Sequence, residues 1–417
     1  MGINAEKQDT GLSILARRTF SSLSSRNFRW YCLGVFASLT GSLMQEIVVA
    51  WIAYQMTGSS FVLGTILFSF QVPMIVVGLA GGWAADRFDR KRIIVATQFL
   101  AFGVSLTWLI LSATGLLEVW HLYALSAVFG TIVAFEIPAR FAIIPQLVEE
   151  KDIMNAFSLD SLLFYSGRVG GPAIAAMMLA FLGATGCFAI NALTYLFELI
   201  TLRKIIPEER DKEDSPGIGE AFRFAYGTPA IRNTLFFVAV MSFCGIYVPL
   251  MPVFTAQLGG TGSLNGLLIA ISEAGAMIGS LLLAYITARK DSVRAVNRMV
   301  GVAGVSYALF FALFAQTFSL TWSLILIVPV GFSMTIVLIG SHAFIQNFVD
   351  DRMRGSISTM FWMYSYFGMF ALGGPTFGWL IETIGPEKTI ILAGSACAIA
   401  STVYIMTRRQ WSIKQPS

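Results

Sequence analysis

Residues 82–91 read Gly-Trp-Ala-Ala-Asp-Arg-Phe-Asp-Arg-Lys and place five charged side chains between two long apolar segments. The flanking segments, 61–85 and 93–116, contain no charged residue. Each is longer than the roughly 20 residues that a helix needs to cross the hydrocarbon core of a bilayer. Because a segment in lipid must satisfy its own backbone hydrogen bonds, both are expected to be helices. Residues 82–91 are therefore predicted to include a short polar loop at a membrane surface.

The composition of the whole chain also indicates a protein embedded in a membrane. Of the 417 residues, 56% are hydrophobic and 12% are charged, and the mean hydropathy is +0.72. A soluble domain has about twice that share of charged residues, which form a polar shell around its core. This composition argues against a soluble enzyme, a nucleic-acid-binding protein and a disordered chain, and it favours a multispanning protein in a lipid bilayer.

Similar apolar runs recur along the chain. We predict twelve transmembrane helices near residues 29–56, 61–85, 93–116, 120–144, 154–182, 187–202, 232–257, 264–287, 298–316, 320–347, 356–381 and 388–406. The cations lie almost entirely in the termini and in alternate loops, whereas the opposite loops hold essentially one, Lys388. Cytoplasmic loops are enriched in Lys and Arg. This distribution therefore predicts an even number of spans with both termini in the cytoplasm.

The longest polar stretch between the predicted helices divides them into six plus six. Residues 218–226 within it are expected to form a short amphipathic helix, and residues 12–20 either lie as a helix on the membrane surface or are unstructured. The expected organisation is a cytoplasmic N-terminal segment (1–27), a first six-helix bundle (28–202), a cytoplasmic linker (203–231), a second bundle (232–406) and a cytoplasmic tail (407–417).

Two features recur about 200 residues apart and indicate an internal repeat. Gly170-Gly171-Pro172 in the fifth predicted helix matches Gly373-Gly374-Pro375 in the eleventh, and a charged stretch precedes each helix. Such small residues allow helices to pack closely. Two six-helix repeats imply a substrate site between them, exposed alternately to each side, as in secondary transporters. No GxxxxGK[ST] motif occurs, so ATP is not expected to drive transport.

The 82–91 stretch resembles the signature of the major facilitator superfamily, G-x-x-x-D-[RK]-x-G-[RK]-[RK], with Asp89 in place of the second glycine. Residues 26–30, 136–140, 145–148 and 155–172 resemble the bacterial branch that includes enterobactin-type siderophore exporters and macrolide-efflux-type proteins. The resemblance covers essentially the whole chain. It implies an all-α membrane protein with the major facilitator fold and pseudo-two-fold symmetry, acting in the bacterial inner membrane as a multi-pass exporter driven by proton antiport.

The resemblance also implies a gate at the cytoplasmic side. Asp86 is expected to face the start of the eleventh helix near residues 355–357, where the helix dipole favours an anion. Arg90 is expected to reach Glu136, which could instead pair with Arg140 four residues on. The other gate residues are Gly82, Arg87 and Lys91. Alternatively, the cations of this loop only set the topology.

Ionisable residues inside the predicted helices are the candidates for proton coupling, because a charge within a bilayer costs a few kcal/mol. Glu46 in the first helix is the first choice, and Arg168 in the fifth is expected to face it because these helices are neighbours in the family's fold. A permanent ion pair that only fixes packing would be the alternative. Glu273 has no obvious cation partner on its own helix, and Asp160 lies nearer the cytosol.

Two further acids are interpreted as peripheral. Glu198, close to Arg203, is expected at the membrane interface, and Glu382 is expected to be solvated at the outer boundary. Residues 167–172 resemble part of the antiporter signature of the fifth helix, or serve only close packing. The predicted fourth helix lacks the arginine that drug–proton antiporters carry beyond the position of Arg140.

Aromatic and amide side chains within the helices predict a cavity suited to a bulky amphipathic molecule. The alternative is that they face lipid or neighbouring helices. Because Arg168 is the only cation expected there, a highly anionic substrate is disfavoured. The candidate cavity residues are Gln45, Gln71, Phe164, Tyr165, His342 and Tyr364.

The leading hypothesis is a monomeric, proton-coupled exporter of an amphipathic small molecule, either drug-like (as in multidrug resistance) or siderophore-like. Uptake symport, uniport and lipid flipping by the same fold stay open. A receptor or assembly factor is disfavoured because no soluble sensor domain is evident. An enzyme is disfavoured because nucleophile, metal and phosphate-binding motifs are missing. The four cysteines and two histidines show no metal-ligand spacing, so neither a metal nor a cofactor is expected.

Overall fold

The computed structural model describes residues 20–208, 218–287, 292–349, 353–362 and 368–407. Within these ranges the secondary structure is helical and contains no strand. Ten helical stretches are long and apolar enough to cross a membrane. The prediction of an all-α, multi-pass membrane protein is therefore confirmed.

The first half of the chain forms five long helices. Gly183 within the last of them has φ 65° and ψ −171°, a conformation that glycine alone adopts readily. It interrupts the helical path between the predicted fifth and sixth spans. The helices are α2 (Arg26–Thr57), α3 (Ser60–Arg87), α4 (Arg90–Thr114), α5 (Val119–Ile143) and α6 (Ile153–Arg203).

Polar side chains begin three of these helices by satisfying free backbone N–H groups. Ser25 accepts from the amide of Phe28 at the start of α2, and Ser59 accepts from Val62 at the start of α3. Asp89 accepts from the amide of Arg92 at 2.8 Å and so begins α4. The departure from the superfamily signature at position 89 thus places a helix cap where the pattern has a glycine.

The second half forms a short helix and eight further helices. The predicted amphipathic helix is observed as α7, whereas residues 12–19 lie outside the described residues. The helices are α7 (Ile218–Gly227), α8 (Pro229–Cys244), α9 (Tyr247–Gln257), α10 (Gly262–Thr287), α11 (Ser292–Ala315), α12 (Leu320–Gln346), α13 (Arg354–Thr359), α14 (Met369–Ile384) and α15 (Pro386–Thr407).

One predicted span differs from the observed helices, and another is described only in part. The span predicted at 232–257 is broken between α8 and α9 at Gly245 and Ile246. Pro249 and Pro252 follow the break and lack the N–H that a continuous helix would use. The span predicted at 356–381 corresponds to α13 and α14, and residues 363–367 between them lie outside the described residues. Apolar run length could not reveal the break at Gly245 and Ile246, because the broken stretch at 232–257 is as apolar as a continuous helix.

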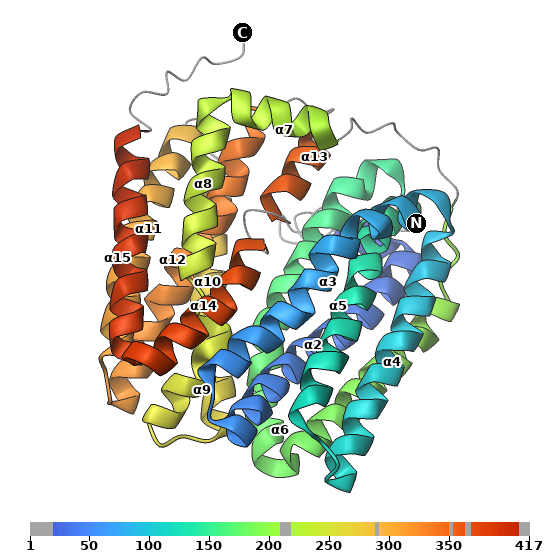
Figure 1. Ribbon diagram of the computed structural model, residues 1–417. Helices are drawn as coiled ribbons and strands as arrows, with labels where there is room; N and C mark the ends of the chain where they lie inside the picture. The colour runs from blue at the N-terminus through green and yellow to red at the C-terminus, as the bar shows by residue number, and fades with distance from the viewer. Residues whose placement is uncertain (1–19, 209–217, 288–291, 350–352, 363–367, 408–417) are drawn as a thin grey trace, which may run out of the picture.

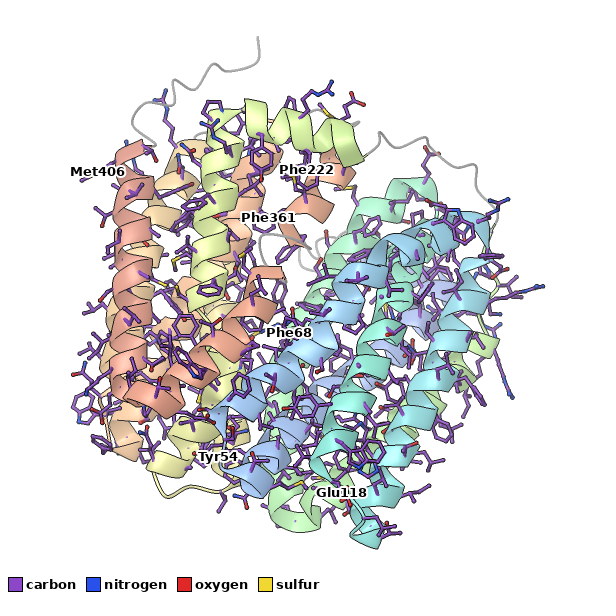
Figure 2. All side chains as sticks on the ribbon, in the orientation of Figure 1. Tyr54, Phe68, Glu118, Phe222, Phe361 and Met406 are labelled. Carbon is purple, nitrogen blue, oxygen red and sulfur yellow. The ribbon has the colours of Figure 1, made fainter. Side chains whose placement is uncertain are left out.

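The helices form two groups, α2–α6 and α8–α15, that lie side by side (Figure 1). The groups touch mainly through α3 with α14 and α6 with α10, with smaller contacts of α9 with α2 and α3. We call the end that carries Arg87, Lys91 and Lys204 the cation-rich end, and the opposite end, near Tyr54 and Glu118 in Figure 2, the far end. In Figure 1 the ribbons of the two groups converge toward the far end and diverge toward the cation-rich end, where α7 and α13 lie.

Large apolar side chains cover the outward surfaces of both groups. Met406 on α15 is 65% exposed and points away from the bundle (Figure 2), and Phe181 and Trp322 are 77% and 59% exposed. An apolar surface of this extent on a soluble monomer would be a liability for aggregation. It fits a bundle whose outer faces contact lipid.

Candidate functional site

A cavity lies between the two groups of helices and is lined by α2, α3, α4, α5, α6, α9 and α10. It contains about 1060 Å³ of space between protein atoms, part of it continuous with solvent. Most of its lining is apolar and includes Phe70, Trp108 and Phe129. Its ionisable lining residues are Glu46, Arg168 and Glu273, which come from α2, α6 and α10.

Arg168 and Glu273 join the two groups of helices through a two-pronged ion pair. The Nε atom of Arg168 donates to Oε2 of Glu273 at 2.9 Å, and Nη2 donates to Oε1 at 2.5 Å. The Glu273 side chain is 5% exposed and that of Arg168 is 32% exposed. The guanidinium also lies 5.9 Å from the ring centre of Phe164. Arg168 lines the same cavity as Glu46, as expected, but its ion pair is with Glu273, so the alternative of a permanent Glu46–Arg168 ion pair is not observed.

Arg168 pairs with Glu273 rather than with Glu46 because α6 packs closely against α10. The backbone of Gly266 in α10 lies directly against Pro172 and Ala176 in α6, where a Cβ atom would collide with the Pro172 carbonyl. From this close approach, Arg168 lies one turn along α6 and Glu273 two turns along α10, within reach of each other. Both residues can be identified from the sequence, but the contact between the two halves that brings them together cannot be predicted from it.

Glu46 lines the cavity beside Arg168 and Glu273. Its side chain is exposed there, and it makes no hydrogen bond or ion pair with any residue that the structure describes. The neighbouring Gln45 is 4% exposed, and its amide oxygen accepts from Asn191 at 2.8 Å and from Ser105 at 3.1 Å. Successive positions of α2 thus place an amide in the packed interior of the first half and a free carboxylate in the cavity.

A second buried ion cluster lies in the first half, toward the cation-rich end. Arg140 Nε lies 2.5 Å from Glu136 Oε1, and Arg140 Nη2 lies 2.8 Å from Glu198 Oε1. The Glu198 side chain is 1% exposed, so the interpretation of Glu198 as an interfacial acid near Arg203 is wrong. Asp160, on the adjacent stretch of α6, accepts from the hydroxyl of Tyr31 at 3.2 Å. Asp160 does not line the cavity.

The predicted gate residues lie at the cation-rich end but do not connect the two groups of helices here. Asp86 is exposed and makes no hydrogen bond or ion pair with a described residue. Glu136 pairs with Arg140 rather than with Arg90, whose Nε has no partner among the described residues. Lys91 donates to the carbonyl of Ile205 at 2.7 Å, and Arg87 lies 5.6 Å from the ring centre of Trp83, next to Gly82.

The far end of the interface is closed by contacts between α3 and α14. Gly64 and Gly374 approach so closely that a Cβ on either would overlap the backbone of the other. Ser60 Oγ donates to the carbonyl of Gly378 at 2.9 Å. Glu382 accepts hydrogen bonds from the hydroxyl of Ser59 and, at 3.1 Å, from the amide of Phe61. Glu382 is exposed, as expected for an acid at the outer boundary, and it also caps the first turn of a helix in the other half.

The remaining glycines and prolines of the repeated motif lie at helix contacts. Gly171 faces Thr40 and Leu43 of α2, and Gly373 lies against the carbonyl of Phe243 in α8. Gly170 has more room, since a Cβ there would lie 3.8 Å from the nearest side-chain atom, on Thr40. Pro172 borders the cavity, and Pro375 follows the contact of Gly374 with α3.

The candidate cavity residues from the sequence are distributed over several places. Gln45 borders the cavity, whereas Gln71 is only 3% exposed and is absent from the lining. Phe164 packs edge-on against Tyr165 beside Arg168, outside the cavity lining. His342 of α12 hydrogen-bonds with Ser358 of α13 at 3.1 Å, and Tyr364 lies outside the described residues. The polar and charged residues of the lining are Ser42, Gln45, Glu46, Ser126, Arg168 and Glu273.

Comparison with known proteins relates almost the whole chain to one family of transporters. The family model described as "Transmembrane secretion effector" matches residues 17–414. Enterobactin exporter EntS of Salmonella choleraesuis is 24% identical over 387 residues, which is 91% of each chain. Macrolide efflux protein A of Streptococcus pyogenes is 24% identical over 284 residues, 66% of this chain and 70% of that protein.

A solved structure has the same fold. The bacterial homologue of the human lysosomal transporter Spinster, in an inward-facing and occupied conformation, superimposes with a TM-score of 0.75. The match covers 94% of this chain and 99% of that one at 15% sequence identity. At this identity the likeness concerns the fold alone.

Proposed function

The chain belongs to the transmembrane secretion effector family of the major facilitator superfamily, and on that premise we propose that it is a proton-coupled exporter of amphipathic small molecules. Membership makes it a membrane transporter. The observation that supports the finer proposal is the cavity between the two halves, where the unpaired Glu46 lies beside the ion pair of Arg168 with Glu273. The names of its relatives point to siderophore-like or drug-like cargo.

The proposed topology has twelve spans in two six-helix bundles, 28–202 and 232–406, with both termini in the cytoplasm of a bacterial cell. The ten apolar stretches support it, since α6 contains two predicted spans on either side of Gly183. The second supporting feature is α13 with α14, which together occupy the position of the predicted eleventh span. The cations then mark the cytoplasmic face, as in other membrane proteins.

In this topology the structure corresponds to an inward-facing conformation. The far end, which would face the outside, is closed by Gly64 against Gly374 and by Glu382 on the first turn of α3. At the cation-rich end Asp86 makes no contact across the halves among the described residues. Export then requires that the far-end contacts open while Asp86 and the neighbouring Arg90 engage the start of α13.

The arrangement of the cavity suggests how a proton would be coupled to this change. Opening the far end separates α6 from α10 and so breaks the pair of Arg168 with Glu273. Leaving a buried charge unpaired costs about 3–5 kcal/mol. Glu46 offers Arg168 a second carboxylate in the same cavity. Because two carboxylates share one guanidinium, the one without it is favoured to take up a proton, and the exchange of partners couples protonation to rocking of the halves.

Transport can be tested in everted membrane vesicles or proteoliposomes with an acidic lumen, loaded from outside with a labelled macrolide, enterobactin or a fluorescent amphipathic dye. We expect accumulation that collapses when the pH gradient is dissipated. Glu46→Gln and Glu273→Gln should each abolish gradient-driven accumulation. Glu387→Gln, an exposed acid at the start of α15, is the matched control and should transport normally. If accumulation is unchanged both by dissipating the pH gradient and by the two cavity substitutions, the carboxylate mechanism is refuted.

A further inference from the structure

We propose that Glu136, Arg140 and Glu198 form a proton-binding site within the first half of the protein, in which two carboxylates share one guanidinium and one proton. None of the three residues belongs to the described lining of the central cavity, so the proposal goes beyond the transport function and its cavity carboxylates. It follows from the charges of these residues, from their burial and from a carboxylate oxygen that has no hydrogen-bond donor.

The guanidinium of Arg140 lies between the two carboxylates. Its Nε atom is 2.5 Å from Oε1 of Glu136, and its Nη2 atom is 2.8 Å from Oε1 and 3.0 Å from Oε2 of Glu198. The side chains of Glu136, Arg140 and Glu198 are 15%, 14% and 1% exposed, respectively. When both acids are ionised, two negative charges and one positive charge leave the site with a net charge of −1.

Close packing of α2 against α6 keeps Glu198 away from water. Gly34 of α2 has no side chain at this contact, where a Cβ atom would lie 3.1 Å from Cγ of Glu198. An uncompensated charge in such a place costs several kcal/mol, and a second carboxylate beside the first adds repulsion. One proton on either carboxyl group removes the excess charge and leaves a single ion pair with Arg140.

Glu198 has an oxygen atom at which that proton can be held. Its Oε2 atom accepts the hydrogen bond from Nη2 of Arg140. Its Oε1 atom is buried and accepts no hydrogen bond from a described residue, although Nη2 lies 2.8 Å away. Buried polar atoms are normally hydrogen-bonded, so a carboxylate oxygen without a donor is the natural position for a proton.

No second cation neutralises the site in the described structure. Both α3 and α4 pack on α5, and their charged residues lie at 86–87 and 90–92. Within the described residues none of these forms an ion pair with Glu136 or Glu198, and Lys91 instead donates to the carbonyl of Ile205. The excess negative charge therefore persists until a proton binds.

The other titratable groups near the site come from α2 and α6, and they are neutral or acidic. The Tyr31 hydroxyl donates to Asp160 at 3.2 Å, which places a third acid nearby. Tyr195 lies three residues before Glu198, on the same face of α6, and its hydroxyl is 2.7 Å from Oγ of Ser42 in the cavity lining. These hydroxyls connect the site with the cavity. The set of neighbouring titratable groups is Tyr31, Cys32, Asp160 and Tyr195.

Infrared spectroscopy of the purified full-length protein tests the proposal, because the carbonyl stretch of a protonated carboxyl group is separate from the bands of a carboxylate. We expect such a band at neutral pH, and we expect Glu136→Gln and Glu198→Gln each to abolish it. Either substitution leaves one carboxylate for one guanidinium, so the shared proton is released whichever acid is removed. An ion pair with a purely structural role would hold no proton and would give no such band.

Three further variants assign the band. It should persist in Glu46→Gln and in Asp160→Asn, and Glu149→Gln is the matched control because Glu149 is 74% exposed on the surface. Loss of the band in Asp160→Asn would place the proton beside Tyr31 and overturn the proposal. Loss in only one of Glu136→Gln and Glu198→Gln would overturn the sharing of the proton.

The unaltered protein provides a test that needs no variant. Absence of any protonated carboxyl band at neutral pH would overturn the proposal. Circular dichroism and a size-exclusion profile show whether each variant is folded. The result does not depend on transport, since a protein without flux can still hold the proton, and an active exporter can lack it.

Discussion

Replacing Arg140 by methionine should strongly destabilise the first half of the protein. Arg140 lies 2.5 Å from Glu136 and 2.8 Å from Glu198, and the three side chains are 14%, 15% and 1% exposed, respectively. Methionine fills much of the same space but removes the cation, which leaves Glu198 buried without its counter-charge. Removing one partner of a buried ion pair typically costs about 3–5 kcal/mol.

The expected loss can be expressed as a change in melting temperature. One kcal/mol shifts the midpoint by about 2–4 °C for a unit of 150–250 residues. If the first six-helix bundle unfolds as such a unit, the cost of about 3–5 kcal/mol lowers its midpoint by about 6–20 °C. A thiol-reactive fluorophore reports this unfolding, because Cys32, Cys187, Cys244 and Cys397 are free and buried in the folded chain.

A second substitution tests whether the stranded charge causes the loss. Adding Glu198→Met to Arg140→Met removes the unpaired acid, so at least half of the lost stability should return, since an apolar replacement of a buried pair is often neutral. Lys151→Met is the control, because Lys151 and its partner Glu149 are 75% and 74% exposed, and exposed pairs contribute little. Additive losses in the double variant, or a midpoint unchanged by Arg140→Met, would refute the reasoning.

The remaining predictions concern the two ends of the cavity. Glu382→Ala removes the cap on α3, worth about 1 kcal/mol. It should therefore raise labelling of a cysteine placed at Ile66 from the far side about fivefold; unchanged labelling would argue against a latch. Gly374→Ala inserts a methyl group against Gly64 and should prevent far-end closure and abolish transport. Gly103→Ala, in open space, should transport normally, and equal activity of the two would contradict the steric argument. Asp86→Asn should increase the inward-facing population, because Asp86 makes no described contact in that state; reduced labelling from the cytoplasmic side would count against its role in the gate.

The residues of the candidate site could be named from the sequence, but their pairing could not. Glu46, Arg168 and Glu273 stand out because ionisable groups inside apolar helices are rare and costly. Which carboxylate holds Arg168 depends on how α6 packs against α10, a contact between residues more than 100 positions apart. The same limitation explains Glu198, whose position near a helix end suggested solvent. The packing of α2 against α6 buries it, and Arg140 of α5 reaches it as an ion-pair partner.

Local sequence patterns predicted the secondary structure well, but they predicted little about the contacts between the two halves. The apolar runs predicted most helices because lipid requires each segment to satisfy its own backbone. They missed the break at Gly245 and Ile246, since a broken helix and a continuous one have the same hydropathy. From the sequence, Asp89 was only a departure from the superfamily signature. The hydrogen bond that it accepts from the amide of Arg92 shows that it caps the start of α4.

By itself, the sequence determined that this chain is embedded in a membrane, that it is helical, and that it has few charged residues within its apolar segments. It could do so because the cost of burying a charge in lipid applies to each segment independently. Only the tertiary structure decided that Arg168 binds Glu273, that Glu46 lines the same cavity without an ion pair, and that Glu382 joins α14 to α3. These contacts depend on the relative position of two bundles. That position differs between conformations of one sequence, and so no pattern along the chain can specify it.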